Sequence, residues 1–87
     1  MTHVLVVEDD PDIGAALEFN LRKEGYGTHC VTHGASALRF LSEGETDLVI
    51  LDLMLPDVHG LEVVRSLRAQ GLQTPVLVLT ALGTVDD

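Results

Sequence analysis

The sequence predicts an α/β domain built on a parallel sheet with helices on both faces. Four short apolar segments alternate with three amphipathic segments along the 87 residues. This alternation is typical of right-handed β-α-β crossovers, which make successive strands parallel. The length allows one small domain, and a content of 46% apolar and 22% charged residues fits a globular chain rather than a disordered one.

The first strand is expected at residues 3–7, where the run HVLVV ends abruptly in acidic residues. A run that is apolar throughout suits a strand buried on both faces of its sheet. A helix is expected over residues 10–25, because Asp10 can cap its N-terminus, Pro11 suits its first turn and Gly25 its end. The apolar residues that recur at helical spacing in it are Ile13, Ala16, Leu17 and Leu21.

A second strand and a second helix follow in the same order. The segment GTHCVT at residues 27–32 predicts a weaker strand, and residues 34–44 predict a short helix that ends at Gly44. The residues of this helix expected to face the sheet are Ala37, Leu38 and Leu41.

The third strand is expected at residues 47–53, in the run DLVILDL. A loop with Pro56 and Gly60 as helix and strand breakers comes next. Residues 61–71 then predict a helix with Leu61, Val64 and either Leu67 or Arg68 inward, and the run VLVLT at residues 76–80 predicts a fourth buried strand.

Composition excludes several classes of function. The net charge is −9, and the five basic residues form no cluster, so this chain is not expected to bind nucleic acid or an anionic membrane by itself. Cys30 is the single cysteine, which rules out an internal disulfide and favours a reducing, cytoplasmic setting. No segment resembles a signal peptide or reaches the length of a membrane span.

Acidic residues follow the ends of two predicted strands. The first strand is followed by Glu8, Asp9 and Asp10, the third ends near Asp52, and the fourth ends at Thr80, before Ala81. Ligands of open parallel sheets bind beyond the carboxyl ends of the strands, so these side chains converge if the first and third strands are neighbours. Clustered carboxylates call for a cation, and Mg²⁺, with Mn²⁺ as an alternative, suits oxygen ligands. A carboxylate beside such an ion can attack phosphorus and form an aspartyl phosphate.

The same residues also suggest other classes of function. The run LVILD also resembles the second nucleotide-binding motif of P-loop ATPases, but the chain has no G-x-x-x-x-G-K-[ST] loop. A haloacid-dehalogenase phosphatase would need an aspartate where Met54 stands. The plain alternative is that Glu8 and Asp9 mark a solvated strand end, that Asp52 is an exposed strand terminus, and that Asp10 serves only as an N-cap.

Three motifs resemble the receiver domain of bacterial two-component response regulators, along the whole chain. They are VLVVEDD, DLVILDLMLPDVHG and PVLVLTA. The resemblance implies a flavodoxin-like, doubly wound parallel sheet of order 2-1-3-4, with residues 1–87 as the N-terminal portion of a receiver domain.

The resemblance also implies the roles of the site residues. Asp52 would be the phosphorylated nucleophile of a phosphorelay and Asp9 a direct Mg²⁺ ligand. Glu8 would complete the acidic pocket, and the backbone carbonyl of Met54 would supply a further metal ligand. The phosphoryl donor would be a phosphohistidine on a sensor histidine kinase or phosphotransfer protein. The domain would catalyse only its own phosphorylation and dephosphorylation.

Four further residues receive roles in the same way. Thr80 would be the switch hydroxyl that moves toward the phosphoryl group, and Ala81 would leave room for that group. Pro56 and Gly60 would shape the loop so that it leaves the strand end sharply, since proline presets φ and glycine tolerates unusual dihedrals.

The chain departs from the family pattern after the fourth strand. The family has a fifth strand with a terminal lysine and a fifth helix, whereas the single lysine here is Lys23. Residues 81–87 resemble the start of the fourth helix in OmpR-like transcription regulators, whose output domain is a DNA-binding winged helix. The chain is therefore expected to be a fragment of a longer regulator, with an exposed edge at residues 76–80 through which it self-associates.

Two other functions remain as alternatives. A receiver-like interaction module without phosphotransfer is compatible with the missing lysine. A flavodoxin-type binder of small molecules is disfavoured, because two Phe, one Tyr and no Trp leave few rings to stack on a flavin.

Overall fold

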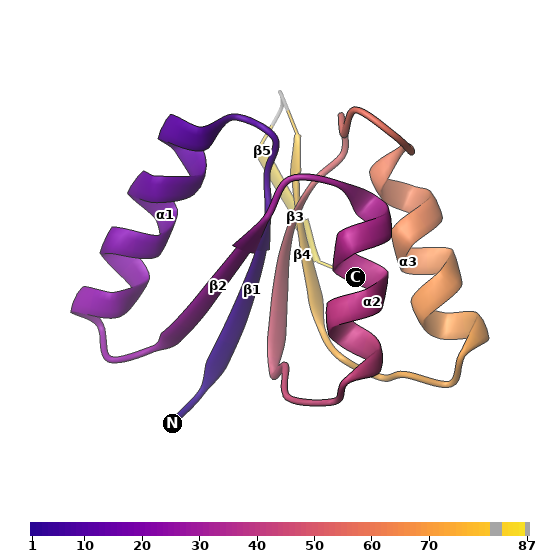
Figure 1. Cartoon of the computed structure of the whole chain (residues 1–87), viewed down its shortest axis with the longest axis horizontal. Coiled ribbons are helices and arrows are strands. Elements are labelled where there is room, and N and C mark those ends of the chain that lie inside the picture. The colour runs from indigo at the N-terminus through magenta and orange to yellow at the C-terminus, as the bar shows by residue number, and fades with distance from the viewer. Residues whose placement is uncertain (81–82, 87) are drawn as a thin grey trace.

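The computed structural model describes residues 1–80 and 83–86, with side chains as far as Leu79. The chain alternates strands and helices and then ends in two successive strands (Figure 1). In order, the elements are β1 (His3–Val7), α1 (Pro11–Lys23), β2 (Gly27–Val31), α2 (Gly34–Ser42), β3 (Leu48–Asp52), α3 (Gly60–Ala69), β4 (Val76–Thr80) and β5 (Gly83–Asp86).

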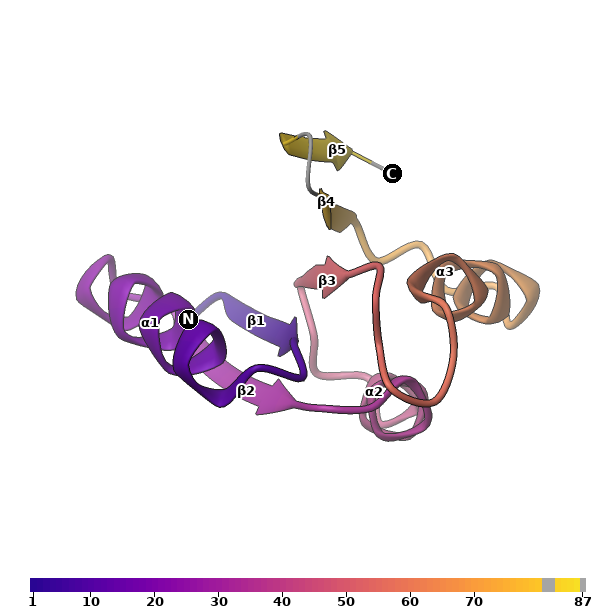
Figure 2. The same cartoon turned by 90° about the horizontal axis from the view of Figure 1, so that it is seen from above.

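One sheet of order β2-β1-β3-β4-β5 runs through the molecule. The pairs β1–β2, β1–β3 and β3–β4 are all parallel, so the expected order 2-1-3-4 is confirmed. Viewed from above, α1 lies on one face of the sheet and α2 with α3 on the other (Figure 2). The doubly wound architecture is therefore also confirmed.

The core is divided by the sheet into two clusters. The larger one joins β1, β3 and β4 to α2 and α3, and the smaller one lies under α1. Leu5, Leu51 and Leu67 are fully buried in the larger cluster. Burying one leucine side chain contributes about 1.5–3 kcal/mol to folding, so these residues anchor the α2/α3 face.

The start of α1 follows the sequence signals. Asp10 has an extended backbone, and its Oδ1 accepts hydrogen bonds from the N–H groups of Asp12 at 2.9 Å and Ile13 at 3.4 Å. Pro11 occupies the first turn, where its missing N–H removes no helical hydrogen bond. Gly25 ends the helix with φ of 95°, a conformation that glycine adopts without strain.

The buried face of α1 differs from the expected one. Gly14 is its buried residue and Leu17 and Leu21 are partly buried, whereas Ile13 is 47% exposed and Ala16 is exposed. A Cβ on Gly14 would lie 3.0 Å from the Sγ atom of Cys30 in β2. The helix backbone therefore sits close to the sheet at Gly14, and this contact turns Ile13 toward solvent.

A similar shift occurs in α3. Val63, Val64 and Leu67 are buried, while Leu61 is 45% exposed. The third inward position, expected at Leu67 or Arg68, is occupied by Leu67. The Arg68 guanidinium instead donates to the carbonyl oxygens of Leu72 and Thr74.

The end of the chain is where the sequence-based expectation was wrong. Residues 81–87 were expected to begin a helix, but Gly83–Asp86 form β5, antiparallel to β4, with Thr80 paired to Gly83. β-branched Thr84 and Val85 favour a strand, and the N–H and C=O groups along the edge of β4 offer it partners. The expected free edge at residues 76–80 is thus paired on both sides.

None of the helices in the described part of the chain is long and apolar enough to cross a membrane. Self-association of this chain stays a prediction. Its premise, a free edge along β4, does not hold in this structure, because β5 pairs with that edge.

Candidate functional site

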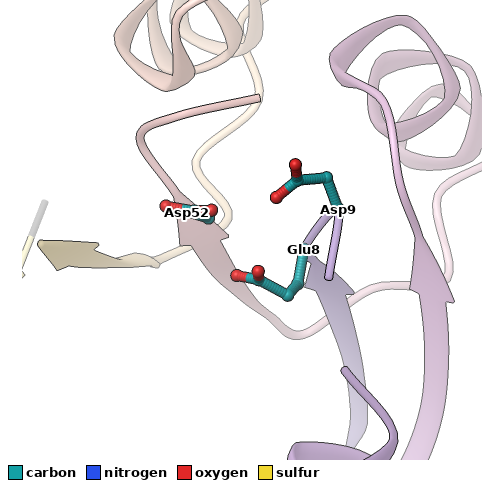
Figure 3. A group of neighbouring side chains, drawn as sticks. All are labelled: Glu8, Asp9 and Asp52. Atoms are coloured by element: carbon teal, nitrogen blue, oxygen red, sulfur yellow. The ribbon is translucent and has the colours of Figure 1, made fainter. Parts of the chain in front are cut away.

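Three carboxylates meet at the carboxyl edge of the sheet, between the ends of β1 and β3 (Figure 3). They belong to Glu8, Asp9 and Asp52, and one oxygen of each lies within 4.8 Å of the others. Two of the three come from consecutive residues, whereas Asp52 is brought to them by the fold. This spacing suits oxygen ligands gathered around one divalent cation.

The strand register explains why the acids meet. β1 and β3 are adjacent and parallel, with Val7 opposite Leu51, so Glu8 follows β1 at the level of Asp52. Adjacent strands lie about 4.8 Å apart, which brings side chains at equivalent positions into contact range. The Glu8 N–H also donates to the carbonyl oxygen of Val31 at 3.0 Å, which ties the end of β1 to the end of β2.

Glu8 is a buried carboxylate, only 5% exposed. Burial raises the pKa of Glu8 above its ordinary value, and the neighbouring Asp52 and Asp9 carboxylates raise it further. The Asp10 N–H, which donates to Glu8 Oε1 at 3.2 Å, acts in the opposite direction. An acid held out of water among like charges is the setting in which a bound cation is most favourable.

The loop after Asp52 turns back on the end of β3. The Met54 N–H donates to Asp52 Oδ1 at 3.2 Å, and the Gly60 N–H donates to the carbonyl oxygen of Leu53 at 2.7 Å. Met54 and His59 form an isolated antiparallel bridge. The Met54 side chain is 73% exposed, so its backbone, rather than its thioether, is the part that this geometry holds next to the acids.

Gly60 makes this tight return of the chain feasible. A Cβ at Gly60 would lie 2.7 Å from the Asp52 carbonyl oxygen and 2.8 Å from the Leu53 Cα. Such contacts are closer than any side chain tolerates without a shift of the backbone. Pro56 lies in the exposed part of the same loop.

Thr80 ends β4 close to the same edge. Asp52 pairs with Leu79 across β3 and β4, and Thr80 is the next residue of β4. The hydroxyl of Thr80 and the whole of Ala81 lie outside the described residues.

Asp57, in the loop that follows Asp52, makes contacts that the sequence did not predict. Its carboxylate accepts hydrogen bonds from the N–H groups of Gly34 at 2.8 Å and Ala35 at 3.0 Å, at the start of α2. These hydrogen bonds lower the pKa of Asp57 below its ordinary value. One signal in the sequence could have raised the question: histidine, which is not among the preferred N-cap residues, stands at position 33 before the predicted helix. In the structure His33 makes no capping hydrogen bond with its side chain.

Comparisons of the sequence with known proteins agree on one family. Residues 4–87 match the family model described as the response regulator receiver domain. The chain is 44% identical over 98% of its length to the "Uncharacterized transcriptional regulatory protein YkoG" of Bacillus subtilis, covering 37% of that protein. It is 43% identical over 95% of its length to the "Probable transcriptional regulatory protein SilR" of Salmonella typhimurium, covering 36% of it. The chain thus spans less than two fifths of these relatives.

Solved structures give the same fold. The receiver domain of the Francisella response regulator 1452 superposes with a TM-score of 0.89 at 30% identity, over 94% of this chain and 68% of that one. The response regulator TrrA of Thermotoga maritima, in complex with Mg²⁺-BeF, superposes with a TM-score of 0.77 at 40% identity. That match covers 80% of this chain and 61% of TrrA.

Proposed function

Since this chain belongs to the response regulator receiver family, we propose that it is a phosphoacceptor switch of a two-component system and that Asp52 is the residue phosphorylated. One observation carries this proposal. Asp52 ends a buried central strand, is itself half-buried, and lies beside two other carboxylates within 4.8 Å. The site therefore combines an accessible nucleophile with donors for a cation.

The reaction is a phosphoryl transfer between two side chains. A carboxylate oxygen of Asp52 attacks the phosphorus of a phosphohistidine on a sensor kinase or phosphotransfer protein. The new O–P bond forms as the N–P bond breaks, and the leaving imidazole takes the electron pair and then a proton. Hydrolysis of the resulting acyl phosphate by water returns Asp52 to its carboxylate form. The domain acts on itself and not on a separate substrate.

The acidic cluster fits a bound Mg²⁺, or Mn²⁺, because its donors are all hard oxygens and the pKa of Glu8 is raised by burial beside like charges. Asp9, Asp52 and the Met54 carbonyl would be its direct ligands, with Glu8 completing the pocket. When bound, the ion supplies positive charge that neutralises the phosphoryl oxygens. The Mg²⁺-BeF complex of TrrA, a relative at 40% identity, supports this assignment.

Residues at the end of β4 would respond to phosphorylation of Asp52. In this proposal the Thr80 hydroxyl donates a hydrogen bond to a phosphoryl oxygen, and Ala81 leaves space for it. Pro56 and Gly60 keep the loop after Asp52 in its sharp turn. The two curated relatives have names that describe transcriptional regulatory proteins, so we propose that the whole regulator acts in the bacterial cytoplasm on transcription.

A second candidate is a receiver-like interaction module that transfers no phosphate. It would use the same fold and surface for binding a partner and would need no reaction at Asp52.

Phosphorylation with a small-molecule donor separates the two candidates. The chain is incubated with acetyl phosphate and MgCl₂, and its intact mass is measured. The phosphoacceptor proposal expects the mass of one added phosphoryl group, lost in Asp52→Asn. Asp47→Asn is the matched control, since Asp47 lies at the other end of β3 and its amide could still accept from the His3 N–H. An unlabelled wild-type chain, or labelling that persists in Asp52→Asn, contradicts the proposal.

A further inference from the structure

The first turn of α2 is capped by a residue from a different loop. The Asp57 Oδ1 accepts from the Gly34 N–H at 2.8 Å, and the Asp57 Oδ2 accepts from the Ala35 N–H at 3.0 Å. Gly34 and Asp57 are 23 residues apart in sequence. The residue at the N-cap position, His33, contributes no side-chain hydrogen bond to the helix. Two of the free N–H groups of this helix start are therefore satisfied from the loop that follows Asp52.

The loop after Asp52 also packs closely against α2 at Gly34. Gly34 is buried, and a Cβ there would overlap the Cγ2 atom of Val58 and come within 3.1 Å of the Cγ2 atom of Val63. The missing side chain lets the loop between β3 and α3 rest directly on the backbone of α2. The Asp57 carboxylate also accepts from the Val58 N–H at 3.0 Å, which fixes its own orientation.

The same loop is fixed at its base by the contacts next to Asp52. The Gly60 N–H bonds to the Leu53 carbonyl oxygen, and the Met54 N–H bonds to Asp52 Oδ1. The segment from residue 53 to residue 59 is thus held at its base by the end of β3 and at its exposed side by α2. Removing the Asp57 carboxylate takes away the hydrogen bonds of the second attachment, while the Met54–His59 bridge and the packing of Leu53, Leu55 and Val58 against the core remain.

We propose that Asp57 is a positioning residue: by capping α2 it holds the loop after Asp52 in one conformation, and so sets how well the acidic site binds a divalent cation and accepts phosphate. This inference rests on the proposed function. The Asp57 carboxylate is not one of the three that cluster at the end of the sheet. In this proposal its effect passes through the backbone of residues 53 and 54, whose freedom increases when the attachment to α2 is lost.

The alternative role is purely local, with Asp57 stabilising α2 and nothing more. A new cap on α2 alone distinguishes the two roles, because it would restore the stability of the helix but not the position of the loop. His33 already has the extended backbone of an N-cap residue, with φ of −131° and ψ of 149°. In Asp57→Ala, the further change His33→Asp supplies a carboxylate to the same helix N-terminus without restoring the attachment of the loop.

The experiment compares the full chain with Asp57→Ala and with the double variant His33→Asp, Asp57→Ala. Stability is measured by urea unfolding, and Mg²⁺ affinity by the amide shifts of Asp9 and Met54 during titration with MgCl₂. Loss of a group that is hydrogen-bonded to a metal ligand typically costs about 10- to 100-fold in metal affinity, and Asp57 acts at one step further, so we take the lower end of this range. We expect Asp57→Ala to lose stability and about tenfold in Mg²⁺ affinity. The double variant should regain stability while its Mg²⁺ affinity and its rate of labelling by acetyl phosphate stay low.

Recovery of Mg²⁺ affinity in the double variant would overturn the inference, as would an unchanged affinity in Asp57→Ala. If the alanine variant does not fold, Asp57→Asn replaces it in the experiment. The asparagine amide oxygen keeps one of the two acceptors, so this variant should lose less Mg²⁺ affinity. The Mg²⁺ titration needs no phosphotransfer. A wild-type chain that binds Mg²⁺ but is never labelled would therefore refute the proposed function and leave the positioning role to be decided by the titration.

Discussion

Gly60 lies so close to Asp52 that no side chain fits between them: a Cβ at Gly60 would be 2.7 Å from the Asp52 carbonyl oxygen. The contact joins the start of α3 to the end of β3, beside the acidic cluster. The absence of a side chain at Gly60 thus allows the backbone at Asp52 to keep its position.

Gly60→Ala is expected to destabilise the chain by about 1–3 kcal/mol, because the added methyl group must push the backbone of β3 away. Labelling of Asp52 should fall as well. Gly44→Asn is the control, since a Cβ at Gly44 would meet nothing within 4 Å and asparagine tolerates its positive φ. Urea unfolding measures both variants, and equal stabilities for the two would contradict the steric argument.

Leu51→Ala should cost about 2–5 kcal/mol, since Leu51 is fully buried between the sheet and the helices α2 and α3. A chain this small has little stability to lose, so a large unfolded fraction is expected at 25 °C. The matched control is Leu61→Ala, at a leucine that is 45% exposed and should cost less than 1 kcal/mol. Thermal unfolding followed by circular dichroism would rank the two variants.

Glu8→Gln is expected to stabilise the metal-free chain, by about 1 kcal/mol, while weakening Mg²⁺ binding. Glu8 is buried beside Asp9 and Asp52, and an amide avoids both the loss of hydration and the repulsion. Glu24→Gln controls for the change in net charge, because Glu24 is exposed at the far end of α1. The prediction is wrong if Glu8→Gln unfolds at the same urea concentration as the wild type in EDTA, or at a lower one.

Asp57 should make the chain lose stability in acid. Hydrogen bonds from the Gly34 and Ala35 N–H groups hold its pKa below the ordinary value of 3.8. A carboxyl with a lowered pKa in the folded state stabilises the fold fully above its unfolded pKa, and this contribution disappears as pH falls through the folded pKa. The difference in unfolding free energy between wild type and Asp57→Asn should therefore stay constant well above pH 3.8 and shrink as the pH falls below 3.8, through the lowered pKa of the folded state. A difference that does not shrink below pH 3.8 would contradict the assignment.

The features that could be predicted from the sequence are those that depend on local signals along the chain. The parallel direction of the first four strands follows from the alternation of apolar strands and short helices, whereas their order was implied by the family resemblance. The N-cap at Asp10 follows from its position before Pro11. Convergence of Glu8 with Asp52 could be expected once β1 and β3 were assumed to be neighbours. These features depend on spacing along the chain, which a sequence displays directly.

The features that were missed depend on contacts between distant segments. The exposure of Ile13 follows from how closely Gly14 approaches Cys30 in β2, a distance that periodicity does not contain. The strand Gly83–Asp86 forms because the edge of β4 offers it hydrogen-bonding partners. The cap that Asp57 places on α2 joins residues that only the folded sheet brings together.

That distant cap has a consequence for the order in which the chain folds. An ordinary N-cap forms together with its own helix, whereas α2 obtains its cap only when β3 and the loop after it have reached their places. Contacts between segments far apart in sequence form late, after the entropy of closing the intervening chain has been lost. The first turn of α2 therefore frays until the strand that carries Asp52 has docked, and loss of the Asp57 carboxylate should speed unfolding rather than slow folding.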